Sequence, residues 1–100
     1  MATIHDVRKA TQDAKDARDA ARTALDKVIA AEDRKTALKP KNDAVSAGGV
    51  AGTKSGEAFA AAADVNTAEA RDLAREADDA AADAKAAALD AVKLYNQKKA

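Results

Sequence analysis

Few side chains in this sequence are of the types that do catalytic chemistry. The single histidine, His5, lies near the start of the chain, and there is no cysteine to share a metal ion with it or to act as a nucleophile. A serine nucleophile needs a neighbouring base, but Ser46 and Ser55, the two serines, lie in a distant glycine-rich stretch. We therefore predict no catalytic residue and a protein that is not an enzyme.

The glycine-rich stretch is where a phosphate-binding loop would be sought. It reads SAGGVAGTKSG over residues 46–56 and contains Lys54. A phosphate-binding loop follows a strand and has the order G-x-x-x-x-G-K-[ST], in which backbone N–H groups surround the phosphates. In this chain the residue five positions after Gly48 is Thr53, whereas the motif needs a glycine there, followed by lysine. We predict a flexible turn and no bound cofactor.

Carboxylates form a row in the last third of the chain, at spacings that place them on one side of a helix. The row is Glu69, Asp72, Glu76, Asp79 and Asp83, and basic side chains recur every seven residues near the start of the chain, at Arg8, Lys15 and Arg22. Helical di-iron sites combine carboxylates with Glu-x-x-His pairs, and no histidine accompanies this row. We predict no metal site. The row is interpreted as a solvated face, or else as one that attracts basic residues of a neighbouring helix or subunit.

Charge and composition exclude two classes of partner. The 17 basic and 17 acidic residues balance, whereas a nucleic-acid-binding protein needs a basic excess, so we expect no nucleic-acid partner. No run approaches the ~20 apolar residues of a transmembrane helix. The first residues, MATIHDVRKATQDAKDA, lack the apolar stretch of a signal peptide. These features predict an intracellular or virion-associated protein without a transmembrane segment.

Helices are the elements expected to position these side chains, within a single helical domain over residues 1–100. The first helix is predicted over residues 3–39, because Thr3 and Asp6 fit a capping box and Pro40 cannot continue a helix. Residues 40–56 hold the only proline and all four glycines and are predicted to form a loop. A short helix over 57–64 and a long helix over 66–98 follow, with one kinked helix as the alternative.

A seven-residue pattern runs through both long predicted helices. From Val7 to Ala31, positions a and d of the first hold only Ala and Val, with Leu38 at a further d position. From Phe59 to Leu94, only Asn66 interrupts the apolar series of the last. A pattern sustained over four heptads or more is typical of a coiled coil. If the two helices are antiparallel, their clusters of large apolar residues meet, with Leu25 beside Leu73.

The same antiparallel register predicts which charged residues lie together. It places Lys15 near Asp83 and Arg22 near Glu76. The predicted fold is therefore all-α: an antiparallel, alanine-rich helical hairpin that assembles into a larger helical bundle.

Alanine dominates the apolar residues, with 31 alanines in a chain that is 47% apolar. A buried methyl group stabilises a fold much less than the ~1.5–3 kcal/mol of a buried Val, Leu or Ile, so a monomer of this length should be weak. Further copies of the chain would bury the apolar side chains that a hairpin leaves uncovered. The residues predicted to form this packing and oligomer interface are Ile4, Val7, Ala14, Ala17, Ala21, Leu25, Val28, Leu73, Ala77, Ala80, Ala84, Ala88, Leu89, Val92 and Tyr95.

We therefore predict a non-enzymatic structural protein, a filament, virion or scaffold subunit that self-associates through alanine-rich helices. One alternative is an adaptor or regulator that binds a partner helix. Another is a desiccation protectant, since TQDAKDARDAARTA and AEARDLAREADDAAADAKAA resemble the Ala-, Lys- and Asp-rich tracts of late-embryogenesis-abundant proteins. The repeats of that family run at eleven residues, whereas seven fits this chain better.

Overall fold

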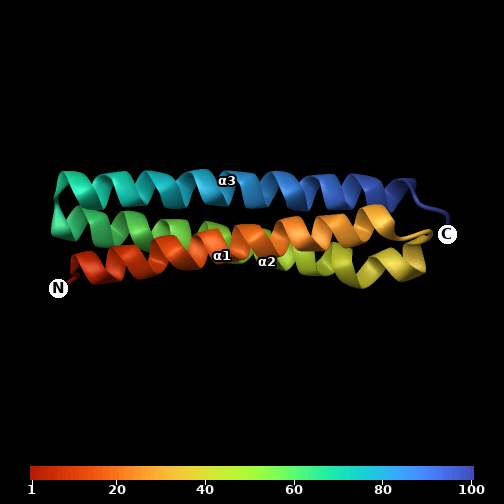
Figure 1. Cartoon of the computed structure of the whole chain (residues 1–100), viewed down its shortest axis with the longest axis horizontal. Coiled ribbons are helices and arrows are strands. Elements are labelled where there is room, and N and C mark those ends of the chain that lie inside the picture. Colours follow the sequence, from red (N-terminus) through yellow and green to blue (C-terminus); the bar gives the residue numbers. More distant parts are fainter.

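The computed structural model describes all 100 residues, and 89% of them are helical. Three helices follow one another along the chain: α1 (Ile4–Ala30), α2 (Arg34–Val65) and α3 (Ala68–Gln97). They form a rod of 50 × 15 × 14 Å with the two termini at opposite ends (Figure 1). The predicted all-α fold is confirmed, and it is built from three long helices.

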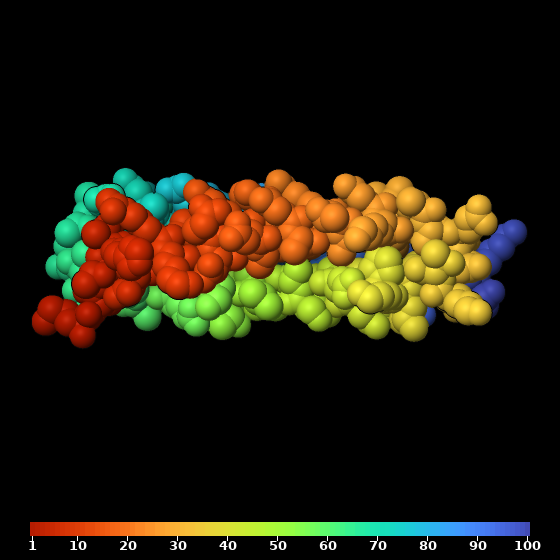
Figure 2. All heavy atoms as spheres, turned by 60° about the horizontal axis from the view of Figure 1, so that its bottom comes forward, coloured from red at the N-terminus to blue at the C-terminus, as the bar shows by residue number.

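The chain runs up, down and up again, so that α1 and α3 are parallel and α2 is antiparallel to both (Figure 1). Figure 2 shows α1 and α2 side by side along the whole length of the rod. The predicted antiparallel pairing of the first and last helices is wrong, because α2 returns the chain between them. Leu25 packs near Ala91 and Leu94 at one end of the bundle, whereas Leu73 packs near Val7 at the other.

The segment predicted to be a loop, residues 40–56, is the middle of α2. α1 ends at Ala30 and not near residue 39, and α2 takes in the predicted loop and the predicted short helix over 57–64. Pro40 is the seventh residue of α2 and has no N–H to donate to the carbonyl of Thr36. The helix nevertheless continues, because Ala37 and Ala44, one turn on either side of Pro40, are both fully buried in the core.

Each helix begins with a hydrogen bond between backbone and a short polar side chain. The bonds run from the N–H of Thr3 to Asp6 Oδ2 (2.9 Å), from the N–H of Thr36 to Asp33 Oδ1 (2.8 Å) and from the N–H of Ala70 to Thr67 Oγ1 (3.1 Å). α2 ends at Asn66, whose φ of 55° is left-handed, a conformation that asparagine tolerates at helix ends. These caps satisfy backbone groups that a helix end leaves unpaired, and they fix the two turns.

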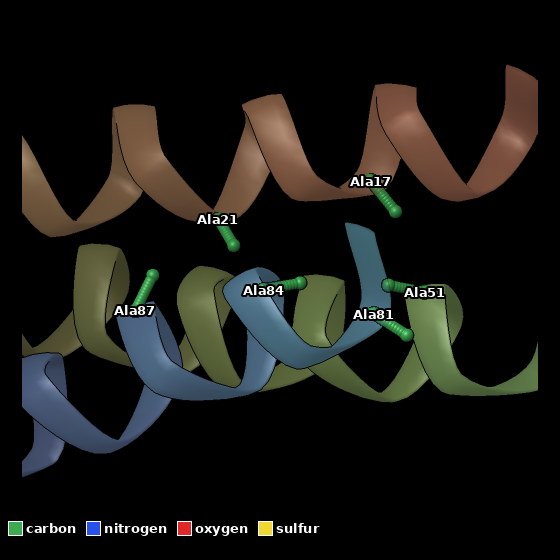
Figure 3. Close-up of a cluster of buried hydrophobic side chains, with 6 residues drawn as sticks. All are labelled: Ala17, Ala21, Ala51, Ala81, Ala84 and Ala87. Atoms are coloured by element: carbon green, nitrogen blue, oxygen red, sulfur yellow. The ribbon is translucent and has the colours of Figure 1, made fainter. Parts of the chain in front are cut away.

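The core consists almost entirely of methyl groups. Twelve residues at seven-residue spacing, four from each helix, have no exposed surface: Val7, Ala14, Ala21 and Val28 of α1; Ala37, Ala44, Ala51 and Ala58 of α2; Ala70, Ala77, Ala84 and Ala91 of α3. In the close-up, Ala21, Ala51 and Ala84 come together from the three helices (Figure 3). The predicted a positions from Val7 to Val28 and from Ala70 to Ala91 are buried, whereas Leu38, Phe59 and Ala63, predicted in the same pattern, lie exposed on α2. Core side chains this small let the helices approach closely, and many weak dispersion contacts replace the bulk of a leucine core.

Candidate interaction surface along α2 and α3

Ion pairs between α1 and α3 repeat at seven-residue intervals. The pairs are Arg8–Glu69, Lys15–Glu76 (2.8 Å) and Arg22–Asp83 (2.9 Å). Three of the five carboxylates in the acidic row thus meet the basic row of a neighbouring helix, which was the alternative to a solvated face, while Asp72 lies near Arg75 of its own helix. The predicted partners of Lys15 and Arg22 were wrong, because the two helices are parallel. Exposed pairs contribute about 0–1 kcal/mol each, so they specify the register of α1 against α3 more than they stabilise it.

Two further polar contacts join α1 to α3 or to the residues that follow it. The buried Thr11 donates its hydroxyl to the backbone carbonyl of Leu73 (3.0 Å). At the far end, Lys98 Nζ donates to the carbonyls of Ile29 (3.1 Å) and Ala31 (2.6 Å). These carbonyls lie at the end of α1, where a cation is favourable for the helix dipole. Polar groups therefore hold the contact between α1 and α3 near both of its ends.

Most polar ties of α2 to the rest of the chain lie at its ends. Arg34 donates its side chain to the carbonyl of Asn96 and its N–H to the carbonyl of Lys99 (both 2.8 Å), and Asp64 accepts from the N–H of Ala2. Between residues 35 and 65 one ion pair crosses to α1, from Lys54 to Asp13 at 3.8 Å, and Lys41 Nζ lies 4.8 Å from the centre of the Tyr95 ring. The hydrogen bond and charge of Glu57, one turn on in α2, raise the pKa of Lys54, and Asp13 adds to this. Methyl contacts in the core supply most of the remaining attachment of α2.

The side of α2 that borders α3 is free of charge, and we call it the outer edge of α2. Its eight residues alternate at spacings of four and three: Leu38, Asn42, Val45, Gly49, Gly52, Gly56, Phe59 and Ala63. Three of them are large apolar residues with close to half of their surface exposed: Leu38 (44%), Val45 (46%) and Phe59 (48%). In a chain that is 34% charged, such an edge is unlike a solvated helix face.

An apolar groove of about 450 Å³ lies where this edge meets α3. We call it the α2–α3 groove, and it is lined by Val45, Gly48, Gly49, Lys85, Ala88, Leu89 and Val92. Leu89, on its α3 side, is 62% exposed. A Cβ added at Gly48 would lie 3.2 Å from Ala88 Cβ, so a larger residue there would force α2 and α3 apart by a few tenths of an ångström. The groove is therefore a consequence of the small residues on its floor.

Two glycines of the edge, Gly49 and Gly56, are not explained by contacts within the monomer. A Cβ added at Gly49 or Gly56 would meet nothing within 4 Å, and no glycine of the chain has a positive φ. Glycine is about 1 kcal/mol less favourable than alanine inside a helix. Neither the conformation nor the packing of the monomer requires glycine at these two positions.

The residues predicted to form the interface divide into three groups. Buried inside the three-helix core are Val7, Ala14, Ala17, Ala21, Val28, Ala77, Ala80 and Ala84. Partly buried at its margins are Ile4, Leu25, Leu73 and Tyr95. Ala88, Leu89 and Val92 line the α2–α3 groove. Most of the set therefore packs within one chain, and the last group lies on the apolar groove that a second molecule could reach.

Sequence reasoning missed the contribution of α2 to this surface. Leu38, Val45, Gly52 and Phe59 are seven residues apart, and so are Ala37, Ala44, Ala51 and Ala58 in the core. Two parallel seven-residue patterns were present in the segment, but the proline and glycines favoured a loop. The pattern, read without regard to those residues, predicts both the buried and the exposed side of α2.

No group of three or more His, Asp or Glu side chains is arranged to hold a metal ion, and none of the helices combines the length and apolarity needed to cross a membrane. Comparison of the chain with family models, with curated proteins and with solved structures finds no match. The class that the fold defines is an all-α three-helix bundle.

Proposed function

We propose that the protein is a non-enzymatic structural protein that self-associates, as a subunit of a filament, virion or scaffold. The observation that carries this proposal is the uncharged outer edge of α2 beside the α2–α3 groove. Large apolar side chains there are about half exposed, and contiguous exposed apolar surface of this kind is typical of a protein interaction site. The alanine seams first expected to mediate association are occupied within the monomer, so the contact is assigned to this surface.

The stability of the monomer gives association a second role. The core is built from methyl groups, apart from Val7 and Val28 among its fully buried positions, and methyl groups contribute little hydrophobic stabilisation each. Binding that involves only the folded chain stabilises it by mass action. Because the net charge is zero, little long-range repulsion opposes association.

The test is the mass of the protein in solution across a concentration series, with one charged substitution on the surface and one beside it. Val45→Lys places a charge in the groove, whereas Val50→Lys places one at an equally exposed position of α2 (49% against 46%) that does not line it. We expect the wild type and Val50→Lys to increase in mass with concentration, and Val45→Lys to stay monomeric with unchanged helix content.

The proposal fails if the folded wild-type chain stays monomeric at high micromolar concentration. The same result would favour the second candidate, an adaptor that binds a partner helix. The observation that supports the adaptor is the shape of the α2–α3 groove, which is apolar and has glycine and alanine on its floor, as a groove for a docked helix does.

A further inference from the structure

We propose that the partner on the outer edge of α2 is a second copy of this chain, bound antiparallel about a two-fold axis that passes between the copies at Gly52. This inference rests on the proposed self-association and specifies its geometry. In a two-fold contact the same surface is used on both copies, so it must be complementary to itself when its direction is reversed. The central five residues of the edge, from Val45 to Phe59, meet this condition.

The order of large and small residues along the edge is nearly symmetric about Gly52. Val45 and Phe59 lie seven residues before and after it, and Gly49 and Gly56 lie three and four residues away. When a second copy is reversed about Gly52, Val45 meets Phe59 of the other copy and Gly49 meets Gly56, whereas Leu38 falls opposite Asn66 at the end of α2. Large apolar groups at the ends and small ones at the centre thus match in the antiparallel direction.

The α2–α3 groove provides space for the largest of these side chains. Val45 forms part of the groove, so a partner that aligns its Phe59 with Val45 directs that ring towards the apolar groups of Leu89 and Val92. The symmetry repeats this contact at the other end of the interface. Phe59 is 48% exposed in the monomer, and the contact buries it in both copies.

This arrangement explains why glycine occupies the central positions of the edge. Gly49 and Gly56 have open space beside them in the monomer. Antiparallel helices with glycine at their crossing point can bring their backbones close together, and the absence of Cβ atoms allows the flanking large residues to reach the partner. Contacts between the copies then offset the lower helix propensity of glycine at these positions.

One charged side chain of α3, Lys85, lies close to the axis in this arrangement. A Cβ added at Gly52 would be 3.3 Å from Lys85 Cε, so the lysine stem runs beside the central glycine. Reversal about Gly52 therefore brings the Lys85 side chains of the two copies towards each other. Like charges placed opposite each other disfavour association, so this geometry predicts that Lys85 weakens the dimer in which it lies.

The projected face of the whole rod limits the area that two copies lying side by side can bury. A face 50 Å long and 15 Å wide covers about 750 Å², and a standard interface buries ~800 Å² on each partner. A second rod aligned along the full length of the first is thus needed to reach this area. Antiparallel alignment about the middle of α2 achieves that overlap.

Disulfide crosslinking tests the geometry, because the natural chain has no cysteine. A disulfide needs Cα atoms ~4.4–6.8 Å apart, so Gly52→Cys is expected to crosslink with itself at the axis. An equimolar mixture of Val45→Cys and Phe59→Cys is expected to give mainly the mixed disulfide. Val50→Cys, exposed on another side of α2, is the matched control and should stay reduced.

Removal of one charge tests the same geometry without crosslinking. Lys85→Gln keeps much of the stem but abolishes the repulsion at the axis, so it is expected to tighten association about twofold to fivefold. Lys93→Gln is the control, since Lys93 lies beside Leu25 and Ile29 on the α1 side of α3, and it should leave the dissociation constant unchanged. Weaker association of Lys85→Gln than of the wild type overturns the placement of the axis.

The outcomes separate this inference from the proposed function. A dimer in which Val45→Cys crosslinks with itself and not with Phe59→Cys overturns the antiparallel geometry, while self-association stands. A wild-type chain that is monomeric at high micromolar concentration overturns both. Crosslinks at Gly52 together with the mixed Val45–Phe59 disulfide support both.

Discussion

Along the contact between α1 and α3, ion pairs repeat every seven residues, whereas the outer edge of α2 carries no charge at any of its eight positions. The two regions have the same helical spacing and lie in one small bundle. Polar contacts favour the observed register between two helices, since a shift of less than seven residues would separate all three pairs and a shift of seven in one direction would lose one of them. An uncharged edge with half-exposed apolar groups specifies nothing within the monomer. We infer that the first region serves the fold and the second serves association.

The largest effect is expected where α2 enters the core. Ala51→Leu adds a larger side chain to a fully buried layer, and overpacking of this kind costs up to about 3 kcal/mol. Ala60→Leu, on the exposed side of α2, is the control and should change the free energy of unfolding little. Urea denaturation measures both. An increase in stability for Ala51→Leu would contradict close methyl packing.

Pro40→Ala is expected to stabilise the protein by about 2 kcal/mol. Proline is ~3 kcal/mol less favourable than alanine inside a helix, and part of the gain is lost because alanine makes the unfolded chain more flexible. Thermal unfolding followed by circular dichroism measures the change. A lower midpoint would mean that the fold requires proline at this position, and that its packing outweighs the missing hydrogen bond.

The glycines of the outer edge distinguish the two roles of α2. In a monomeric Val45→Lys background, Gly49→Ala and Gly56→Ala should each raise the free energy of unfolding by about 1 kcal/mol. In the otherwise natural chain the same substitutions should weaken association, measured by sedimentation. If both properties improve together, these glycines have no part in the contact between copies.

For the contact between α1 and α3, a double-mutant cycle of Lys15→Ala and Glu76→Ala should give a coupling energy of ~0.2–1 kcal/mol. The cycle of Lys15→Ala with Asp83→Ala should give none, because Asp83 pairs with Arg22. The reverse result would mean that α1 and α3 are antiparallel.

The smallest effect is expected at low pH, at the cap of α2. The hydrogen bond from the backbone N–H of Thr36 holds the pKa of Asp33 below its usual value. A carboxyl group with a lowered pKa in the folded state stabilises the fold above its unfolded pKa, and this contribution is lost as the pH falls through the lower, folded pKa. Hydrogen exchange below about pH 4 should therefore increase at the start of α2 before it increases at the start of α3. The cap of α3 is Thr67, which does not titrate, and it serves as the control; equal exchange at both helices would contradict the role of Asp33.

The sequence predicts the helical class and the buried positions of α1 and α3, because their seven-residue patterns are uninterrupted. It does not predict α2, since local propensity and tertiary packing conflict there. Pro40 and the glycines each disfavour a helix, and the buried series from Ala37 to Ala58 outweighs them only after three helices have packed together. A conflict of this kind is settled by packing, which a local reading of the residues cannot weigh.

The charge pattern also could not predict whether α3 runs parallel or antiparallel to α1. Lys15 and Arg22 are seven residues apart, and so are Glu76 and Asp83. Two pairs of equal spacing match in either direction, so parallel and antiparallel arrangements both bring opposite charges together. The candidate surface was missed for a related reason, because its residues on α2 were expected in a loop.

The methyl-lined core has a consequence for the response of the protein to temperature. The heat-capacity change of unfolding follows the apolar surface exposed, and typical domains reach ~12–15 cal/mol/K per residue. A core of alanines exposes less apolar surface on unfolding, so the heat-capacity change per residue should be smaller for this chain. Its stability curve is then broad and shallow, which moves cold denaturation to lower temperature and makes folding nearly insensitive to moderate cooling.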